Sequence, residues 1–553
     1  MTQAIKHFFA RPVEQSVVNN KKSRYENIAA FALCMLVSVV FLGICTRSSP
    51  LYPLNDWVDS NCFFTVGKAM MNGKVVYRDI YEQKGILLYF IHGLGYLISN
   101  TTFFGVFIFE VVSFTFFLYI AYLIARLYSN YAFSLAILPV ISWSVLTSVS
   151  LRQGDSAEEF CLPYILFAIY ALLKNLRRGD GSGIPDNRTV FIMGACAACI
   201  LWIKYTMLGI YIGYVLTAVI LCIIDKDIKK LFSAALSFAL GAIAVSLPFL
   251  IYFAVNGALD DLYITYFYNN MFLYVDERSF TEKFGGIFSL SIKAFAFNKF
   301  WGYMAYLGLF ALIVDIREPR GALGGLLMYF AHIFFIYWGG IGWYYYSFGM
   351  VSLSIFGFVT LSRVCGYVWD KLTILFRAWY EKYKNSLTEQ KKREITSIFD
   401  RRTLATVGYI CTACLVLSLS TLYADKSYQE CPNVFYMEQK REDIWQTKFA
   451  EIINASEDRT LLNYSCLDLG LYTTAHIVPS EKYFARLNID LPEMKESLER
   501  SIREQHTEFV VVRSAPSQFV LYYYELVASE TSHVEYEGSQ ISYHLLRRKD
   551  ILK

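Results

Sequence analysis

Long apolar runs recur along most of this 553-residue chain, and they limit what it can fold into. Most approach the ~20 residues that an α-helix needs to cross the hydrocarbon core of a bilayer. Hydrophobic residues make up 55% of the sequence and charged residues only 18%, which excludes an ordinary soluble balance. The sequence therefore predicts an all-α polytopic membrane protein. The runs lie near residues 27–46, 103–125, 131–150, 158–173, 189–203, 207–224, 231–254, 300–315, 322–338, 347–363 and 404–423, with a shorter one at 86–99.

The first apolar run is expected to be retained rather than cleaved as a signal peptide. It follows an N-terminal segment that carries Lys21, Lys22 and Arg24, and it lacks a clear small-residue cleavage site. We therefore predict a cytoplasmic N-terminus over residues 1–26 and a transmembrane domain over 27–423.

Basic residues between the runs predict the orientation of the helices, because cytoplasmic loops carry an excess of Lys and Arg. Residues 85 and 152 should both lie outside, yet three apolar runs stand between them. One of these runs, either 86–99 or the one that contains Pro139, is therefore expected to be re-entrant or a surface helix. We expect 11 full spans, with 12 or 13 as alternatives. The basic segments, expected inside, are 174–188, 226–230, 317–320 and 364–403; the segments expected outside are 47–85, 151–157, 204–206, 255–299, 339–346 and 424–553.

Residues 424–553 differ in composition from the rest of the chain. Charged residues return, β-like runs occupy 508–512 and 541–546, and 491–504 has a helical pattern. A segment of about 130 residues can bury its own core, so we predict a small extracytoplasmic α/β domain. Its Cys431 and Cys466 could pair in an oxidising compartment.

Several classes of site find no support in the sequence. The pairs Cys196–Cys199 and Cys411–Cys414 lie inside apolar runs without nearby His or charge, so we interpret them as small core residues rather than metal ligands. No P-loop, dinucleotide-binding glycine pattern or zinc spacing stands out. The net charge of +4 is explained by the cytoplasmic loops, and nothing indicates nucleic-acid binding.

The polar loop at 47–85 is the clearest candidate site, because a bilayer tolerates ionisable groups only where they act or face water. Residues 59–71 predict an amphipathic helix lying on the membrane, with Lys68 facing water. Asp59 would open this helix, either as its N-cap or as a general base that takes the proton of an attacking hydroxyl. Asp56, three residues earlier, is the rival base; residues three apart can share a helix face, so one carboxylate could orient the other or raise its pKa.

Cationic residues near the predicted outer ends of helices have two interpretations each. Lys84 and Lys204 could be anchors at the water–lipid boundary, or they could neutralise a leaving phosphate. Arg78 could bind a ligand or form an ion pair with Asp79 that braces the loop.

The roles of the acidic and aromatic residues at the same ends of the helices are also undecided by the sequence. Asp155 and Glu158 could offset a helix dipole or contact hydroxyl groups of a sugar or acceptor. The tyrosines of 344–346 could form an aromatic belt at the interface.

The order of elements in the polar loop resembles the first external loop of GT-C class membrane glycosyltransferases. An aspartate opens a juxtamembrane helix, Val76-Tyr77-Arg78-Asp79 follows, and Glu82-Gln83-Lys84-Gly85 enters an apolar run. Within that class the chain is similar to the branch of protein O-mannosyltransferases and the aminoarabinose transferase of lipid A, the PMT/ArnT-like branch. Ser60 departs from the glutamate of an Asp-Glu pair, and Ile86 stands where proline is frequent. The resemblance is specific over roughly residues 50–90 and looser elsewhere.

This resemblance implies a GT-C fold and an inverting transfer of a sugar from a polyprenyl-phosphate donor. The acceptor would be a surface glycan, lipid or protein of the cell envelope, at the outer face of the bacterial plasma membrane. No cofactor is expected, because this branch works without a catalytic metal; a divalent cation between Asp59 and the acids at 155–159 is the alternative. Competing interpretations are a transporter or flippase of lipid-linked sugar, and an inactive GT-C-like membrane protein.

The resemblance also assigns roles to the candidate residues. Asp59 would be the catalytic base, with Asp56 as the alternative. The donor phosphate and the acceptor or sugar would be held by two further groups: Lys84, Lys204, Arg78 and Tyr345 for the phosphate, and Asp155 and Glu158 for the acceptor or sugar.

Overall fold

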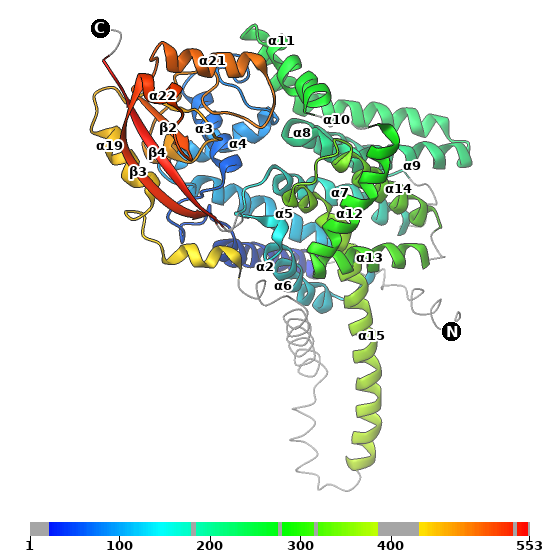
Figure 1. Ribbon diagram of the computed structural model, residues 1–553. Coiled ribbons are helices and arrows are strands. Elements are labelled where there is room, and N and C mark those ends of the chain that lie inside the picture. Colours follow the sequence, from blue (N-terminus) through cyan, green and yellow to red (C-terminus); the bar gives the residue numbers. More distant parts are fainter. Residues whose placement is uncertain are drawn as a thin grey trace.

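The computed structural model describes residues 21–177, 184–274, 279–314, 319–384, 431–534 and 539–550 (Figure 1). A bundle of helices forms the larger part of the chain, and a small sheet domain follows it. The helical elements of the larger part are α2 (Lys21–Cys45), α3 (Val58–Met71), α4 (Ile86–Ile98), α5 (Phe104–Tyr128), α6 (Tyr131–Leu146), η2 (Val149–Leu151), α7 (Ala157–Arg177), α8 (Asn187–Lys204), η3 (Tyr205–Leu208), α9 (Gly209–Asp225), α10 (Ile228–Val255), α11 (Leu259–Leu262), η4 (Tyr263–Leu273), α12 (Phe280–Phe297), α13 (Lys299–Val314), α14 (Pro319–Tyr337), η5 (Tyr344–Met350) and α15 (Val351–Lys384).

Six helical segments among the described residues are long and apolar enough to cross a membrane, which makes the chain an integral membrane protein. The number of full spans stays a prediction, and the run at 404–423 lies outside the described residues. Helix α4 has 13 residues and extends only about 20 Å, short of the ~30 Å hydrocarbon core, which agrees with a segment that does not span. The six segments are Arg24–Cys45, Phe104–Tyr128, Asn187–Asp225, Ile228–Val255, Arg320–Tyr337 and Tyr344–Phe376; the shorter apolar helices are Ile86–Ile98, Tyr131–Leu146 and Lys299–Ile313.

The helices pack closely where small residues replace bulky ones. A Cβ atom on Gly194 of α8 would lie 2.0 Å from the carbonyl oxygen of Phe238 in α10, and one on Gly241 would lie 1.9 Å from that of Phe191. Only glycine permits this approach, as is common between membrane helices.

One expectation is wrong: residues 364–384 are not a loop, because α15 continues through them to Lys384. In Figure 1 this helix extends well beyond the bundle.

The segments that the basic residues assigned to the outer side gather at one end of the bundle, although which side of the membrane this end faces remains a prediction. Hydrogen bonds join these segments, or residues directly next to them, in pairs: Arg47 N–H to Gln153 O (2.7 Å), Tyr81 N–H to Lys482 O (2.9 Å), Gly85 N–H to Ile203 O (3.0 Å), and Ser150 N–H to the Asn298 side-chain oxygen (3.2 Å).

The C-terminal part forms the predicted α/β domain. Its four strands are ordered β1-β2-β4-β3, with β1 and β2 parallel and the other pairs antiparallel. The sequence pattern located β2, β4 and α21 but missed β1, which has three residues, and β3, an edge strand that is rich in polar residues. The elements are η6 (Pro432–Glu438), α19 (Trp445–Asn454), β1 (Leu461–Asn463), α20 (Leu471–Thr474), α21 (Pro492–Arg503), β2 (Phe509–Arg513), α22 (Gln518–Tyr523), β3 (Tyr524–Val534) and β4 (Ser539–Arg548).

Lys68 of helix α3 does not face water, and this part of the expectation is wrong. Lys68 is 2% exposed, and its ammonium donates to the carbonyl oxygens of Tyr472 and, at 3.1 Å, Ile477 in the C-terminal domain. Burial lowers the pKa of Lys68 to about 8. Thr65, one turn earlier, donates to Asp468 at 2.6 Å. The helix that begins beside Asp59 is therefore covered by the C-terminal domain.

The suggested pairing of Cys431 with Cys466 is also wrong. Cys466 is a buried thiol near Asp468 and Arg513, and no disulfide joins it to Cys431. The thiol of Cys431 instead faces the end of α2, where its sulfur lies 3.7 Å from the carbonyl oxygen of Cys45.

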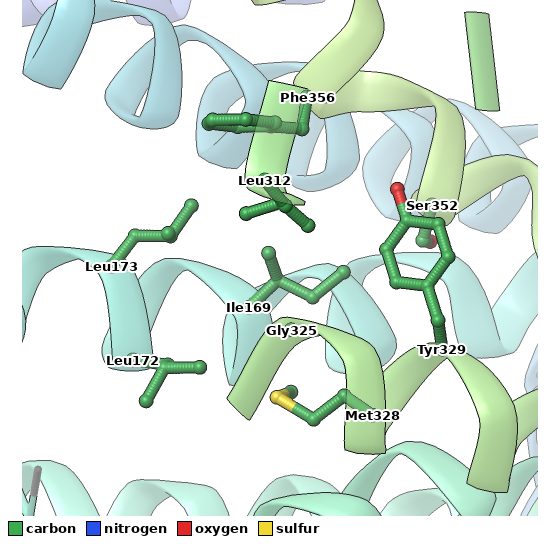
Figure 2. Close-up of a pocket in the computed structure, with 9 residues that line it drawn as sticks. All are labelled: Ile169, Leu172, Leu173, Leu312, Gly325, Met328, Tyr329, Ser352 and Phe356. Atoms are coloured by element: carbon green, nitrogen blue, oxygen red, sulfur yellow. The ribbon is translucent and has the colours of Figure 1, made fainter. Parts of the chain in front are cut away.

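A small cavity of about 20 Å³ lies among α7, α13, α14 and α15 (Figure 2). Its lining is apolar except for two hydroxyls, and both already donate to backbone carbonyls: Tyr329 to Leu353, and Ser352 to Leu162 at 3.4 Å. Because both hydroxyls are already engaged in this way, we interpret the cavity as a packing gap rather than a ligand site.

Candidate active site

Side chains from six separate segments meet at the end of the bundle beside the C-terminal domain. They come from the start of α3, the loop before α4, the start of α7, the end of α8, the end of η4 and the start of η5. We call this group the outer cluster; it consists of Asp59, Glu82, Lys84, Glu158, Lys204, Tyr274, Tyr345 and Tyr346.

Asp59 lies in the first turn of α3 but is not its N-cap. The N-cap is Trp57, whose side chain makes no capping hydrogen bond. The partly buried carboxylate of Asp59 instead faces Lys84 and accepts a hydrogen bond from Tyr345. The ring of Tyr345 is held in turn by an edge-to-face contact with Trp57 at 5.1 Å. The capping interpretation is therefore wrong, and the carboxylate is left available for chemistry.

The electrostatic surroundings of Asp59 suit a general base. Burial raises the pKa of Asp59 above that of an ordinary aspartate; the ammonium of Lys84 opposes the shift, and the carboxylate of Glu82 adds to it. A raised pKa makes an ionised carboxylate a stronger proton acceptor while leaving it able to ionise.

Lys84 is fixed by the turn that carries it. Its backbone N–H donates to Glu82 at 2.9 Å and to the hydroxyl of Tyr89 at 2.7 Å, and its carbonyl accepts from Tyr77 at 2.6 Å. The ammonium lies 4.0 Å from Glu82. Burial would lower the pKa of Lys84, but Glu82 and Asp59 outweigh it and hold the pKa above its ordinary value. The ammonium therefore stays charged at neutral pH.

Lys204 enters the same cluster from the end of α8. Its backbone is extended, with φ −154° and ψ 97°, which separates α8 from η3 and α9 as the two apolar runs predicted. The ammonium is buried, pairs with Glu158, and lies 3.6 Å from the centre of the Tyr346 ring. It is also near enough to Lys84 for the two charges to interact. A boundary anchor would instead extend its charge into water.

Gly85 sets the distance between the two lysines. A Cβ atom at this position would lie 2.0 Å from the carbonyl oxygen of Trp202, and the Gly85 N–H bonds Ile203 at 3.0 Å. Only glycine lets the Lys84 turn approach the end of α8 so closely.

Gly85→Ala should therefore separate Lys84 from Lys204. We expect a fall in transfer rate of about 10- to 100-fold, because a misplacement near 1 Å at a reacting centre can cost 10²-fold. Gly43→Ala in α2 is the matched control, since its Cβ meets nothing within 4 Å. Initial rates of purified variants measure the effect; equal rates for Gly85→Ala and the parent would mean that this approach does not matter.

Asp155 lies in a second, fully buried network rather than in the outer cluster. Its carboxylate is 2.9 Å from Nε2 of His92, and its N–H donates to Glu110 at 2.8 Å and Glu159 at 3.0 Å. Burial raises the pKa of Asp155, and His92 opposes the shift. The left-handed backbone of Asp155, with φ 63°, is held by these bonds.

The second network reaches the start of α3 through Ser60. The Ser60 hydroxyl lies 3.4 Å from the Asp155 carbonyl oxygen and 3.5 Å from that of Gly154. In this chain the residue after Asp59 thus braces the start of α3 against the loop before α7.

The two remaining sequence candidates lie outside the cluster. Asp56 forms an ion pair with Arg47 at 2.5 Å, and its side chain is 32% exposed. Arg78 is paired with Asp79 at 2.8 Å and donates to the carbonyl oxygen of Asn256 at 2.6 Å, which confirms the ion pair that was one of its two interpretations.

Asp56 also lines a polar cleft of about 500 Å³ between the first loop and the C-terminal domain. Carboxylates, lysines and two aromatic residues share its wall. Asp56, Tyr436, Trp445, Lys448 and Glu530 are among the lining residues.

Sequence reasoning missed Glu82 and Tyr274 as members of the cluster, and His92 and Glu110 as members of the second network; Tyr346 belongs to the tyrosine group 344–346 that the sequence had singled out. The signal for Glu82 was present, because it stands two residues before Lys84 in a polar turn. Within the described ranges, no group of three or more His, Cys, Asp or Glu side chains is placed to hold a metal ion. That the protein works without a metal, with a divalent cation as the alternative, stays a prediction.

Comparisons with known proteins establish the fold and the family. A search of curated sequences finds no match. The chain is similar in structure to ArnT from Cupriavidus metallidurans bound to undecaprenyl phosphate (TM-score 0.57, 13% identity, 95% of this chain and 98% of that chain) and in the apo state (0.54, 12%, 94% and 97%). This likeness confirms the GT-C fold. A family model described as "Putative competence-induced protein Ccs4 N-terminal domain" matches residues 19–297, half of the chain. The chain therefore belongs to the family of the competence-induced protein Ccs4 N-terminal domain.

Proposed function

We propose that this protein is an inverting glycosyltransferase that moves a sugar from a polyprenyl-phosphate donor to a hydroxyl acceptor. The observation that carries the proposal is the outer cluster, in which a carboxylate with a raised pKa, Asp59, lies beside the two ammonium groups of Lys84 and Lys204. One solved structure with the same fold contains undecaprenyl phosphate, which supports a lipid-phosphate donor.

The reaction follows from these charges. The acceptor oxygen attacks the anomeric carbon of the sugar while Asp59 takes the hydroxyl proton. The bond between the anomeric carbon and the phosphate oxygen breaks, and polyprenyl phosphate leaves. A single displacement of this kind inverts the anomeric centre, and no group of the protein becomes covalently attached to the sugar.

The lysines favour the transition state over the bound donor. A sugar phosphodiester carries one negative charge, and the departing phosphate gains a second as the bond breaks. Lys84 and Lys204 are fixed before the reaction by the turn at Glu82 and by Glu158, so their charges need no reorganisation. The hydroxyl of Tyr345 orients the Asp59 carboxylate toward the acceptor.

We place the acceptor in the polar cleft beside Asp56, because this cleft adjoins the loop that carries Asp59 and offers hydrogen-bonding groups to a hydroxyl-rich molecule. Glu158 remains the candidate contact for the transferred sugar, since it belongs to the cluster. Asp155 is fully buried against His92, so we propose that it positions the loop and touches neither substrate.

A transporter of lipid-linked sugar is the second interpretation. Such proteins bind their cargo near the middle of the membrane, whereas the ionisable residues of this cluster gather at one end of the bundle.

In our proposal, the active site, the C-terminal domain and the acceptor all lie on the outer face of the plasma membrane. The reaction would then belong to cell-envelope glycan synthesis.

Mass spectrometry of surface glycans and lipid-linked sugars, in cells with and without the protein, tests this function. We expect loss of one sugar from a surface glycan, lipid or protein and accumulation of the matching polyprenyl-phosphate sugar. Identical profiles in both strains would contradict the proposal.

A further inference from the structure

We propose that Cys45 and Cys431 form a disulfide bond that ties the C-terminal domain to the outer end of α2. Cys45 is the last residue of α2, and Cys431 immediately precedes η6, the first element of the C-terminal domain among the described residues. The inference rests on the outward orientation in the proposed function, because the bond needs an oxidising compartment.

The two thiols are adjacent although 386 positions separate them in sequence. The sulfur of Cys431 lies 3.7 Å from the carbonyl oxygen of Cys45, and the two thiol groups are within hydrogen-bonding reach of each other. Both residues are buried, with exposures of 2% and 6%. Most other described cysteines lie in helices of the bundle, where we interpret them as small core residues.

Neighbouring bonds hold the two cysteines together independently of their sulfurs. The side-chain amide of Asn433 donates to the Cys45 carbonyl oxygen at 2.7 Å and to that of Arg152 at 2.8 Å. Arg47 donates to Asn433 at 2.8 Å and stacks 3.2 Å above the ring of Tyr436. Folding of the chain therefore brings the two thiols together without help from the disulfide.

The same junction leads directly to the candidate site. Arg47 pairs with Asp56 in the wall of the polar cleft, three residues before Asp59. Locking Cys431 to Cys45 would hold Tyr436 and Asn433 against Arg47, and so fix both the cleft and the loop that carries the base.

Oxidation proceeds by thiol–disulfide exchange with an extracytoplasmic protein disulfide. The thiolate of one cysteine attacks the disulfide of the oxidant and releases one thiol; the second cysteine then attacks the mixed disulfide and releases the other. Two protons and two electrons leave Cys45 and Cys431, and the oxidant becomes a dithiol. Because both cysteines are buried in the folded protein, the bond forms while the C-terminal domain folds onto α2.

Non-reducing peptide mapping of the full-length protein, denatured in the presence of N-ethylmaleimide so that buried thiols also react, tests the inference. We expect one linked species that joins the Cys45 and Cys431 peptides, two hydrogens lighter than the reduced pair. It should disappear in Cys45→Ser and Cys431→Ser and persist in Cys466→Ser. Dithiothreitol should lower the thermal midpoint of the parent and leave that of Cys431→Ser unchanged. Complete alkylation of both cysteines in the parent overturns the inference.

A labelling experiment separates failure of the bond from failure of the orientation. Lys440 is 73% exposed in the C-terminal domain, so Lys440→Cys can be labelled with a membrane-impermeant maleimide on intact cells. Labelling together with two alkylated thiols overturns only the disulfide. Protection until lysis overturns the outward orientation, and with it both the disulfide and the proposed location of the site.

Discussion

Asp59→Asn is expected to lower the turnover of sugar transfer by about 10²- to 10⁴-fold, the usual contribution of general acid–base catalysis. Asparagine fills nearly the same volume but cannot take the acceptor proton. Lys84 and Lys204 are unchanged in this variant, so the affinity for polyprenyl phosphate should stay close to that of the parent. Initial rates at saturating donor, together with a separate binding titration, measure the two effects.

Asp56→Asn is the matched control, because it removes a carboxylate three residues away. Asp56 pairs with Arg47 and lines the cleft, so its loss should act on acceptor affinity more than on turnover. Full activity in Asp59→Asn would return Asp59 to a structural role. Equal losses in both variants would leave the base unassigned.

The pH profile gives this prediction a second readout. The base works only when ionised, and burial raises the pKa of Asp59 above the ordinary aspartate value of 3.8. Activity should therefore fall as the pH drops through that raised pKa, so the acid limb should lie above the range of an exposed aspartate. The residual activity of Asp59→Asn should lack this limb. A parent profile that is flat down to pH 4 would argue against Asp59 as the base.

Lys84→Ala is expected to weaken polyprenyl-phosphate binding by roughly 10- to 100-fold. A charge-assisted hydrogen bond is worth ~1.5–3 kcal/mol, and each 1.4 kcal/mol is a factor of ten in affinity. Lys84→Arg should rescue binding only in part, because a planar guanidinium does not reproduce a compact ammonium. Titration of the purified variants with polyprenyl phosphate measures the loss.

Lys204→Ala should weaken binding similarly if both lysines hold one phosphate. It also leaves Glu158 buried without its partner, which is destabilising, so Lys204→Ala combined with Glu158→Gln should be measured beside it. Arg78→Ala is the matched control, since Arg78 contacts Asp79 and Asn256 rather than the cluster. Donor binding unchanged in Lys84→Ala but lost in Arg78→Ala would reverse these assignments.

The local part of the site could be predicted from sequence, and the long-range part could not. Asp59 and Lys84 stand in one polar loop between two apolar runs, and the basic residues placed Lys204 at the same end of the bundle. The covering of α3 by the C-terminal domain could not be foreseen, because an amphipathic helix such as 59–71 suits a membrane surface and a domain interface equally well.

Apart from the contact of Glu82 with Lys84, the contacts that were missed join residues far apart in the chain. His92 and Glu110 lie inside apolar runs, and their partner Asp155 is brought to them only by the packing of α4, α5 and α7. Likewise, nothing in the sequence distinguishes Cys45 from Cys466 as the neighbour of Cys431. Such pairs are set by tertiary packing, on which local periodicity has no bearing.

Reconstitution of the protein into proteoliposomes with a polyprenyl-phosphate sugar, labelled in the sugar, tests the central claim most directly. With an envelope extract as acceptor, the account predicts that the sugar moves to acceptor while an equal amount of free polyprenyl phosphate appears. Asp59→Asn should abolish both. Movement of the intact lipid-linked sugar across the bilayer, with no release of polyprenyl phosphate, would contradict the account and favour a transporter.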